Sequence, residues 1–216
     1  MKTKRILSII LTILLVVSAL PTVEFNVRAS SETVINTTGF AGGSGTQENP
    51  YLIETKVHLN NVRNNLGAHY KMISNIVFTD LDFQEDGDFY NNGAGWLPIG
   101  NGESNAFTGT FDGNGYRISN IRMNYSVNAD TNIGFFGVTK GSVKNLLLSG
   151  SVNFTITNPA TYYVGGLVGY ASGEVINCTS ECEIKVSSSF ASAIVDQSTL
   201  YLGGIAGYSK QRIENC

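Results

Sequence analysis

The chain has 216 residues and a formal charge of −3 at neutral pH, and 14% of its residues are charged. It contains 24 glycines, 4 prolines and many Val, Ile, Thr, Tyr and Phe residues, which is typical of short strands joined by tight turns. The low charge density argues against a disordered chain. There is no basic patch in the sequence, so binding to the polyanionic backbone of nucleic acid is excluded.

The N-terminal segment 1–29 has the layout of a secretory signal peptide. Basic residues precede a nearly unbroken apolar run from Ile6 to Leu20, and Val27-Arg28-Ala29 offers a cleavage site. The alternative is a single membrane anchor, but the run is shorter than the roughly 20 residues that span a bilayer. We therefore expect removal of residues 1–29, secretion, and no stable transmembrane segment afterwards. The mature chain would keep 10 basic and 16 acidic residues, a net charge of −6.

Internal repeats dominate the rest of the sequence. Three segments combine a glycine-framed apolar pair with a later hydrophobic-x-Asn pattern, at residues 134–146, 166–178 and 204–216. A fourth match, Ile118-Ser119-Asn120-Ile121, carries the Asn pattern alone. In the three full segments the second glycine and the Asn are always the same distance apart, from Gly137 to Asn145, from Gly169 to Asn177 and from Gly207 to Asn215. The constant interval predicts equivalent units that stack in parallel and bury a continuous core, with loops of varying length between them.

The repeated asparagines, Asn120, Asn145, Asn177 and Asn215, fall where a turn meets a strand. Such an Asn can hydrogen-bond its own backbone or the equivalent Asn one unit above. The sequence therefore predicts either a stacked asparagine ladder or a row of surface turn residues.

The N-terminal part differs from the repeats. Thr55 is placed to cap a helix through Lys56 to Leu66, because Leu59, Val62 and Leu66 share one face at helical spacing. We therefore divide the chain into four parts. They are a signal peptide at 1–29, a linker at 30–39, an N-terminal cap at 40–66, and repeats at 67–216. The last matching strand start reaches Cys216, so we expect these residues to be the N-terminal part of a longer protein.

Several of these segments resemble GLUG-motif-containing bacterial secreted and surface proteins. The resemblance rests on Gly166-Leu167-Val168-Gly169 and on GFFG at 134–137 and GGIAG at 203–207. The sequences FAGGSGTQENPYLIET, GWLPIGN and FTGTFDGNGYRISNI, which precede them, also look like the start of such proteins. The resemblance covers residues 38–216 and implies a right-handed parallel β-helix (solenoid) in an exported bacterial protein. Together with the cap and the interrupted last repeat read from the residues, the predicted fold is all-β, with a short N-terminal helical cap and an incomplete C-terminal end. Similar repeats precede the catalytic domain of IgA-specific zinc peptidases of the M26 type. The family implies no ligand residues that could be transferred to this sequence.

Candidate catalytic chemistry is sparse. Neither His58 nor His69 begins the HExxH pattern of a zinc peptidase. The best cluster is acidic, and a calcium loop there is one interpretation because calcium prefers oxygen ligands. The expected bidentate Glu is replaced by Gly93, so a solvated loop is the other interpretation. The candidate calcium ligands are Asp80, Asp82, Asp86 and Asp88. No catalytic residue and no other cofactor is predicted.

Two further groups have alternative interpretations. Cys178 and Cys216 occupy the same repeat position, so they could form a disulfide between stacked units or pack as free thiols. Tyrosines gather near the glycine motifs, where they could form an exposed track for sugars or proteins or a stacked ladder. These tyrosines are Tyr162, Tyr163, Tyr170, Tyr201 and Tyr208.

The leading functional hypothesis is a non-catalytic secreted or cell-surface repeat segment for adhesion, partner binding or spacing. Its partner would be a host or cell-envelope protein or a glycan, and surface attachment would lie beyond Cys216. The alternatives are the non-catalytic N-terminal region of a secreted zinc metallopeptidase and part of a polysaccharide-active β-helix enzyme. The sequence downstream of Cys216 would discriminate among the three.

Overall fold

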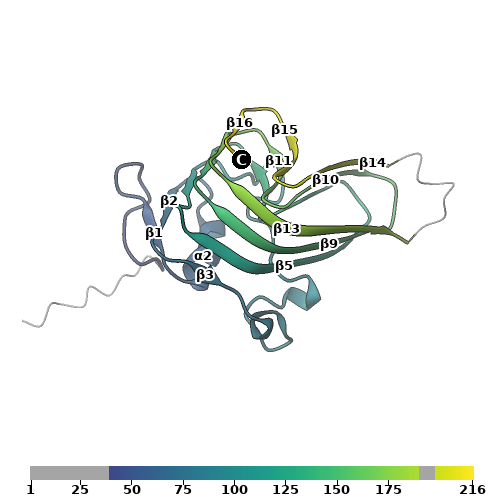
Figure 1. The fold of residues 1–216 in the computed structure, drawn as a ribbon, viewed down its shortest axis with the longest axis horizontal. Coiled ribbons are helices and arrows are strands. Elements are labelled where there is room, and N and C mark those ends of the chain that lie inside the picture. Colours follow the sequence, from purple (N-terminus) through teal and green to yellow (C-terminus); the bar gives the residue numbers. More distant parts are fainter. Residues whose placement is uncertain (1–38, 190–197) are drawn as a thin grey trace, which may run out of the picture. The chain divides into compact units, whose positions relative to one another are not determined.

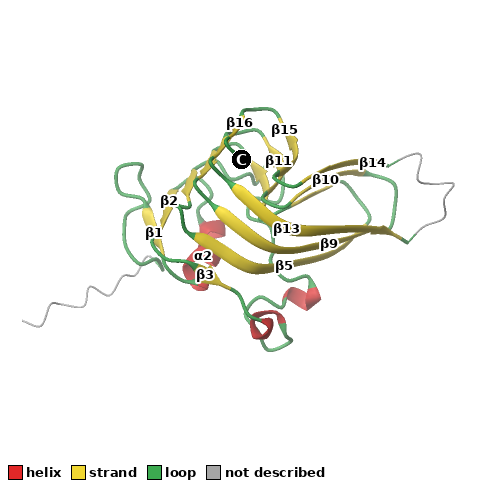
Figure 2. Ribbon diagram, viewed as in Figure 1, coloured by secondary structure: helices red, strands yellow, loops and turns green. Residues whose placement is uncertain are grey.

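The computed structural model describes residues 39–189 and 198–216. Within them the protein is almost entirely β, with one short α-helix and three 3₁₀ turns (Figure 2). The predicted signal peptide, and nearly all of the predicted linker, lie outside the described residues.

In residues 39–189 and 198–216, sixteen strands form four sheets in which every named pair is parallel. Neighbours in a sheet come from successive passes of the chain, so each sheet is a stack of equivalent strands (Figure 1). The first sheet has the order β1 (Tyr51–Ile53), β2 (His69–Met72), β4 (Thr110–Asp112), β8 (Ser142–Lys144), β12 (Val175–Ile176) and β16 (Ile213–Glu214). The second has β3 (Ile76–Val77), β5 (Arg117–Val127), β9 (Leu147–Ile156) and β13 (Thr179–Ser188). The third has β6 (Thr131–Ile133), β10 (Thr161–Gly165) and β14 (Thr199–Gly203), and the fourth has β7 (Phe136–Thr139), β11 (Val168–Ala171) and β15 (Ala206–Ser209).

The core lies between the sheets and is built from columns of apolar side chains. Along the first sheet, Tyr70, Phe111, Val143 and Val175 follow one another in register, and all four are buried. A neighbouring aromatic group is centred on Trp96, whose ring stacks on Phe135 at a centroid distance of 5.1 Å. Burial of large aromatic side chains supplies much of the hydrophobic stabilisation in such a core.

The predicted helix is present but shorter than expected. It is α2 (Lys56–Asn61), with Thr55 as its N-cap: the Thr55 hydroxyl accepts a hydrogen bond from the His58 backbone N–H. The chain then tightens into the 3₁₀ turn η1 (Val62–Asn64) instead of continuing to Leu66. Leu59 and Val62 are fully buried, as the helical spacing predicted. Two further 3₁₀ turns are η2 (Asp80–Phe83) and η3 (Asn91–Gly93).

The predicted asparagine ladder is confirmed for three of its four members. The amide of Asn215 donates to Asn177, that of Asn177 donates to Asn145, and that of Asn145 donates to Asp112, at 3.1, 3.2 and 2.9 Å. The three asparagines have φ angles of 53° to 55°, in the left-handed region that Asn tolerates better than most residues. Each therefore turns the corner after a short strand and also bonds the pass before it.

The predicted equivalence of Asn120 with the other asparagines is wrong. Val143 pairs with Phe111, so Gly113 is the residue that stands beside Asn145. Asn120 lies in β5, at the register shift between Ile118 and Ile121, and its amide donates to Phe78. Asp112 takes the place of the missing asparagine, because its carboxylate accepts the bond from Asn145.

The second glycine of each motif stands where a side chain cannot fit. A Cβ on Gly169 would lie 2.7 to 2.9 Å from three backbone atoms of Ile133, Gly137 and Asn132. A Cβ on Gly207 would lie 2.5 Å from the backbone nitrogen of Val164. Backbone atoms cannot rotate out of the way, so glycine is what allows neighbouring passes to approach so closely.

We expect replacement of Asn177 to separate the two roles of the ladder. Asn177→Gly should lose only the amide hydrogen bonds, at a cost of about 1 kcal/mol. Asn177→Ala should cost roughly 1–2 kcal/mol more, because alanine also disfavours the left-handed conformation. Urea unfolding followed by circular dichroism measures both values. Equal destabilisation by the two variants would contradict a conformational role for Asn177.

Gly169→Ala should destabilise the protein by about 3 kcal/mol, the scale of overpacking a close-packed site. Gly204→Ala is the matched control, because a Cβ there meets no atom within 4 Å. Its effect should stay within about 0.5 kcal/mol. Thermal unfolding of the two variants checks the difference, and similar melting temperatures would show that the glycine motif does not enforce close packing.

Candidate functional site

A groove with a volume of about 650 Å³ lies between the segment 97–105 and β6. We call it the β6 groove. It takes side chains from three separate parts of the sequence. Its polar lining comprises Arg63, Asn64, Asn101, Asn105, Asp130 and Asn132, and its apolar lining includes Leu66, Leu97, Pro98 and Ile133.

The wall of the β6 groove is anchored to the core. The Trp96 indole N–H donates to the Phe135 carbonyl at 3.1 Å, and the Tyr125 hydroxyl donates to the Trp96 carbonyl at 2.8 Å. Arg63 lies over the Trp96 ring, 5.0 Å from its centroid, and donates to the Leu97 carbonyl at 3.1 Å. Burial lowers the pKa of Arg63, but an arginine keeps its charge at any physiological pH. The groove is therefore preformed around a fixed cation.

Four tyrosines form a cluster beside the groove, on β10, β11, β14 and β15. We call Tyr163, Tyr170, Tyr201 and Tyr208 the tyrosine cluster. Tyr163 stacks on Tyr201 at 4.9 Å, Tyr170 on Tyr208 at 5.2 Å, and the two pairs meet edge to face, with Tyr163 and Tyr170 5.1 Å apart. Tyr201 and Tyr208 are 37% and 38% exposed. The cluster is thus a stacked ladder that also reaches solvent, so the two interpretations of these tyrosines combine.

Tyr162 does not belong to the cluster. It is fully buried, its ring packs edge to face on Phe154 at 5.3 Å, and its hydroxyl donates to the Asn158 carbonyl. The alternation along β10 therefore sends Tyr162 into the core, while Tyr163 joins the partly exposed tyrosine cluster.

The β6 groove and the tyrosine cluster adjoin through one register position. Asn132 in the groove is the direct parallel partner of Tyr163, which in turn is the partner of Tyr201. Asp130, at the same end of the groove, accepts a hydrogen bond from the Thr161 backbone N–H at 2.8 Å. A ligand that leaves the groove past Asn132 would therefore meet the tyrosines next.

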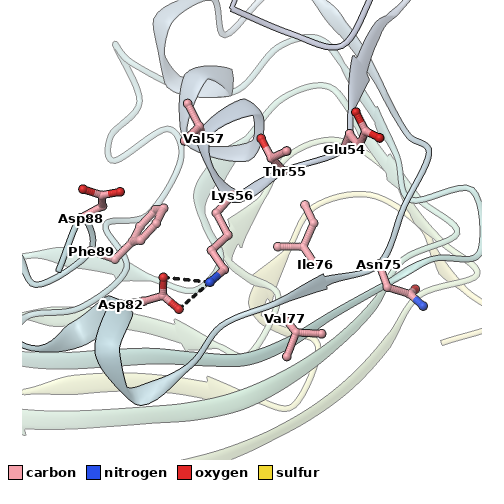
Figure 3. Close-up of a pocket in the computed structure, with 10 residues that line it drawn as sticks. All are labelled: Glu54, Thr55, Lys56, Val57, Asn75, Ile76, Val77, Asp82, Asp88 and Phe89. Atoms are coloured by element: carbon pink, nitrogen blue, oxygen red, sulfur yellow. Dashed lines mark hydrogen bonds and ion pairs between the residues drawn. The ribbon is translucent and has the colours of Figure 1, made fainter.

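Two of the four predicted calcium ligands, Asp80 and Asp82, form ion pairs with basic side chains. Asp82 forms an ion pair with Lys56 at 2.6 Å, as Figure 3 shows, and accepts a bond from the Thr79 N–H. Burial raises the pKa of Asp82, but the hydrogen bonds from Lys56 and Thr79 outweigh it and hold that pKa below its usual range. Asp80 pairs with Arg122. Asp88 lies apart from Asp82 in Figure 3.

No group of three or more His, Cys, Asp or Glu side chains that could hold a metal ion occurs in the described parts of the chain. Asp86 and Asp88 are exposed. The four carboxylates therefore do not form a metal-binding cluster in the described structure.

The cysteines and histidines make contacts within the fold and do not come together in a common site in the described residues. Cys178, Cys182 and Cys216 are free thiols. Cys178 is buried, which raises its pKa to about 11, and its backbone N–H donates to the Cys216 sulfur at 3.3 Å. His58 Nδ1 accepts a bond from the Glu54 N–H beside α2, and His69 lies in β2.

Comparison with known proteins identifies one motif within these repeats. The family model described as "The GLUG motif" matches residues 160–184, which run from the start of β10 into β13. The described residues thus define an all-β protein of parallel repeats. Residues 160–184 of this chain therefore carry a GLUG motif.

Two curated proteins are similar to this chain. A candidate Gly-rich membrane protein of Evansella cellulosilytica is 43% identical over 147 residues, which are 66% of this chain and 16% of that protein. Halomucin of Haloquadratum walsbyi is 33% identical over 142 residues, 64% of this chain and 1% of that protein. The chain therefore spans a small part of the length of either relative.

A crystal structure of a candidate immunoglobulin A1 protease from Bacteroides ovatus aligns with 81% of this chain and 66% of its own chain. The identity is 14% and the TM-score is 0.41. None of the helices in the described residues is long and apolar enough to cross a membrane.

We expect calcium not to bind the acidic loop, because Lys56 and Arg122 already neutralise Asp82 and Asp80. Calorimetric titration of the protein with millimolar calcium should give only the heat of dilution. A saturable heat that disappears in Asp86→Asn/Asp88→Asn would contradict this expectation and establish the calcium loop.

Proposed function

We propose that this chain is a non-catalytic surface segment in which a right-handed parallel β-helix (solenoid) presents a binding face to an external partner. The observation that carries the proposal is the tyrosine cluster, stacked in register on the same scaffold that the asparagine ladder builds. A cluster of partly exposed aromatic side chains is unusual on a protein surface, and such patches mark interaction sites. Binding or adhesion is therefore favoured over a role as a spacer.

Different residues of each repeat build the scaffold and the proposed binding face. The constant interval between the second glycine and the Asn builds the corner and is the same in each repeat. The tyrosines flank the glycines only in the second and third repeats, as Tyr163 and Tyr170, then Tyr201 and Tyr208. The corresponding positions of the first repeat hold Asn132 and Val138. The same backbone thus carries different side chains at equivalent positions, as expected of a scaffold with a local binding surface.

A location outside the cell is part of the proposal. Residues 1–29 would direct export and be removed. The relatives named as a Gly-rich membrane protein and as halomucin support a surface or extracellular setting. The partner would be a cell-envelope or host component, either a protein or a glycan.

The role assigned to the tyrosine cluster is tested with surfaces of defined composition. Labelled full-length protein, after export, would be sedimented with purified bacterial cell-wall sacculi and with mucin-coated beads. The wild type should be retained by at least one surface, and Tyr201→Ala/Tyr208→Ala should weaken that retention by about tenfold, because truncated aromatic anchors commonly cost over ~1 kcal/mol.

The matched control is Lys185→Ala/Ser187→Ala, which changes two exposed residues of β13 on another sheet. It should bind like the wild type, and circular dichroism should show that both variants keep their fold. Absence of retention on every surface, or equal retention of both variants, would refute the proposed function.

A further inference from the structure

We propose that the β6 groove is a binding site for a neutral oligosaccharide. This inference rests on the proposed surface function and names the ligand class of the same face. It is carried by the balanced charge of the groove, its planar hydrogen-bonding groups, its apolar strip and its continuity with the tyrosine cluster.

The charges that line the groove favour an uncharged ligand. Arg63 contributes one cation and Asp130 one anion, so the lining has no net charge. Glu103 and Lys140, on or next to the 97–105 wall, neutralise one another in an ion pair of 3.0 Å. A phosphorylated or sulfated ligand would need an excess of cations, and a cationic ligand an excess of carboxylates. Neither excess is present in this lining.

The polar groups match pairs of hydroxyls. A carboxamide offers a donor and an acceptor side by side, and adjacent hydroxyls of a pyranose offer the same pattern. The side-chain amides of Asn64 and Asn132 make no hydrogen bond with other described residues, so both are available to a ligand. Asn101 and Asn105 are joined by a bond of 3.0 Å, which holds a second pair of amides in place. The groove therefore presents two amides without a partner among the described residues and a second pair of amides held together by a hydrogen bond.

The apolar strip matches the other face of a sugar. Leu97 is 40% exposed, although it borders a groove full of polar groups. Leu66 and Pro98 extend this strip, and the partly exposed Tyr125 adds an aromatic ring whose hydroxyl is fixed on Trp96. A pyranose has one face of C–H groups and a rim of hydroxyls, so it would cover the strip while its hydroxyls meet the amides. Combining apolar walls with a few placed polar groups is the usual composition of a ligand site.

The size and continuity of the groove indicate a chain of sugars. Its volume of about 650 Å³ is within the range of small-ligand sites and exceeds that of one sugar ring. The chain of register partners Asn132, Tyr163 and Tyr201 leads from the groove to the tyrosine cluster. An oligosaccharide held by its first residues in the groove would continue over these rings.

The experiment titrates the full-length protein, after export, with neutral tetrasaccharides of glucose, N-acetylglucosamine, mannose and xylose. An anionic tetragalacturonate and an uncharged tetrapeptide are included as comparisons. Isothermal calorimetry should detect saturable binding of at least one neutral sugar. Asn64→Ala/Asn132→Ala should weaken it by roughly tenfold to hundredfold, the loss expected for two ligand hydrogen bonds.

Asn153→Ala is the matched control. Asn153 is an exposed asparagine of β9, on a different sheet, whose amide bonds only Asn124 among the described residues. It should leave the affinity unchanged. Both variants should melt within a few degrees of the wild type, since the side chains of Asn64 and Asn132 make no hydrogen bonds of their own in the described structure.

Three outcomes would overturn the inference: no binding of any neutral sugar, tighter binding of the tetragalacturonate or the peptide, or equal affinity in the groove variant and the wild type. Each leaves the proposed function standing if the wild type is still retained on sacculi or mucin through the tyrosine cluster. Sugar binding in solution without retention on either surface would instead refute the proposed function and keep the groove as a saccharide site.

Discussion

The structure depends on keeping successive passes of the chain in register. A shift by one residue along any strand would turn its buried side chains outward, because side chains alternate between the two faces of a strand. The corners fix this register. At three of them an Asn holds the left-handed conformation while its amide bonds the pass before it. Within β7, β11 and β15 a glycine lets the strand lie close against neighbouring backbone. Once the register is fixed, equivalent apolar side chains of successive passes lie above one another and form the buried columns.

The same constraint places the outward side chains. The parallel register places Tyr163 beside Asn132 and Tyr201 beside Tyr163. The residue at one position of a pass therefore determines which side chain its partner on the next pass contacts. The two adjacent tyrosine pairs are thus consequences of substitution at fixed register positions, whereas the β6 groove also takes side chains from η1 and the segment 97–105. The tyrosine cluster needs no special backbone, and its chemistry can change while the fold stays the same.

The sequence predicted what is periodic and missed what is not. The interval from Gly169 to Asn177 predicted the ladder, because the same interval recurs. The prediction for Asn120 was wrong because the hydrophobic-x-Asn pattern, without the glycine pair before it, also fits a bulged strand. No sequence pattern identified Asp112 as the residue that replaces an asparagine in the ladder. The β6 groove left no motif, because Arg63, Asn101 and Asn132 are far apart in the chain and become neighbours only through the stacking.

The asparagine ladder also has a direction. Every amide donates toward the N-terminal side, and the series ends on Asp112, whose Oδ1 accepts the last bond. Its second oxygen faces Lys144 at 3.5 Å. If a complete repeat were inserted between two existing repeats, its Asn would accept a hydrogen bond from the Asn on one side and donate one to the Asn on the other. An incomplete repeat without the Asn would leave the neighbouring donor and acceptor unpaired. The ladder therefore tolerates the gain or loss of complete repeats. Asp112 stays the N-terminal end of the ladder whatever the number of repeats that follow it.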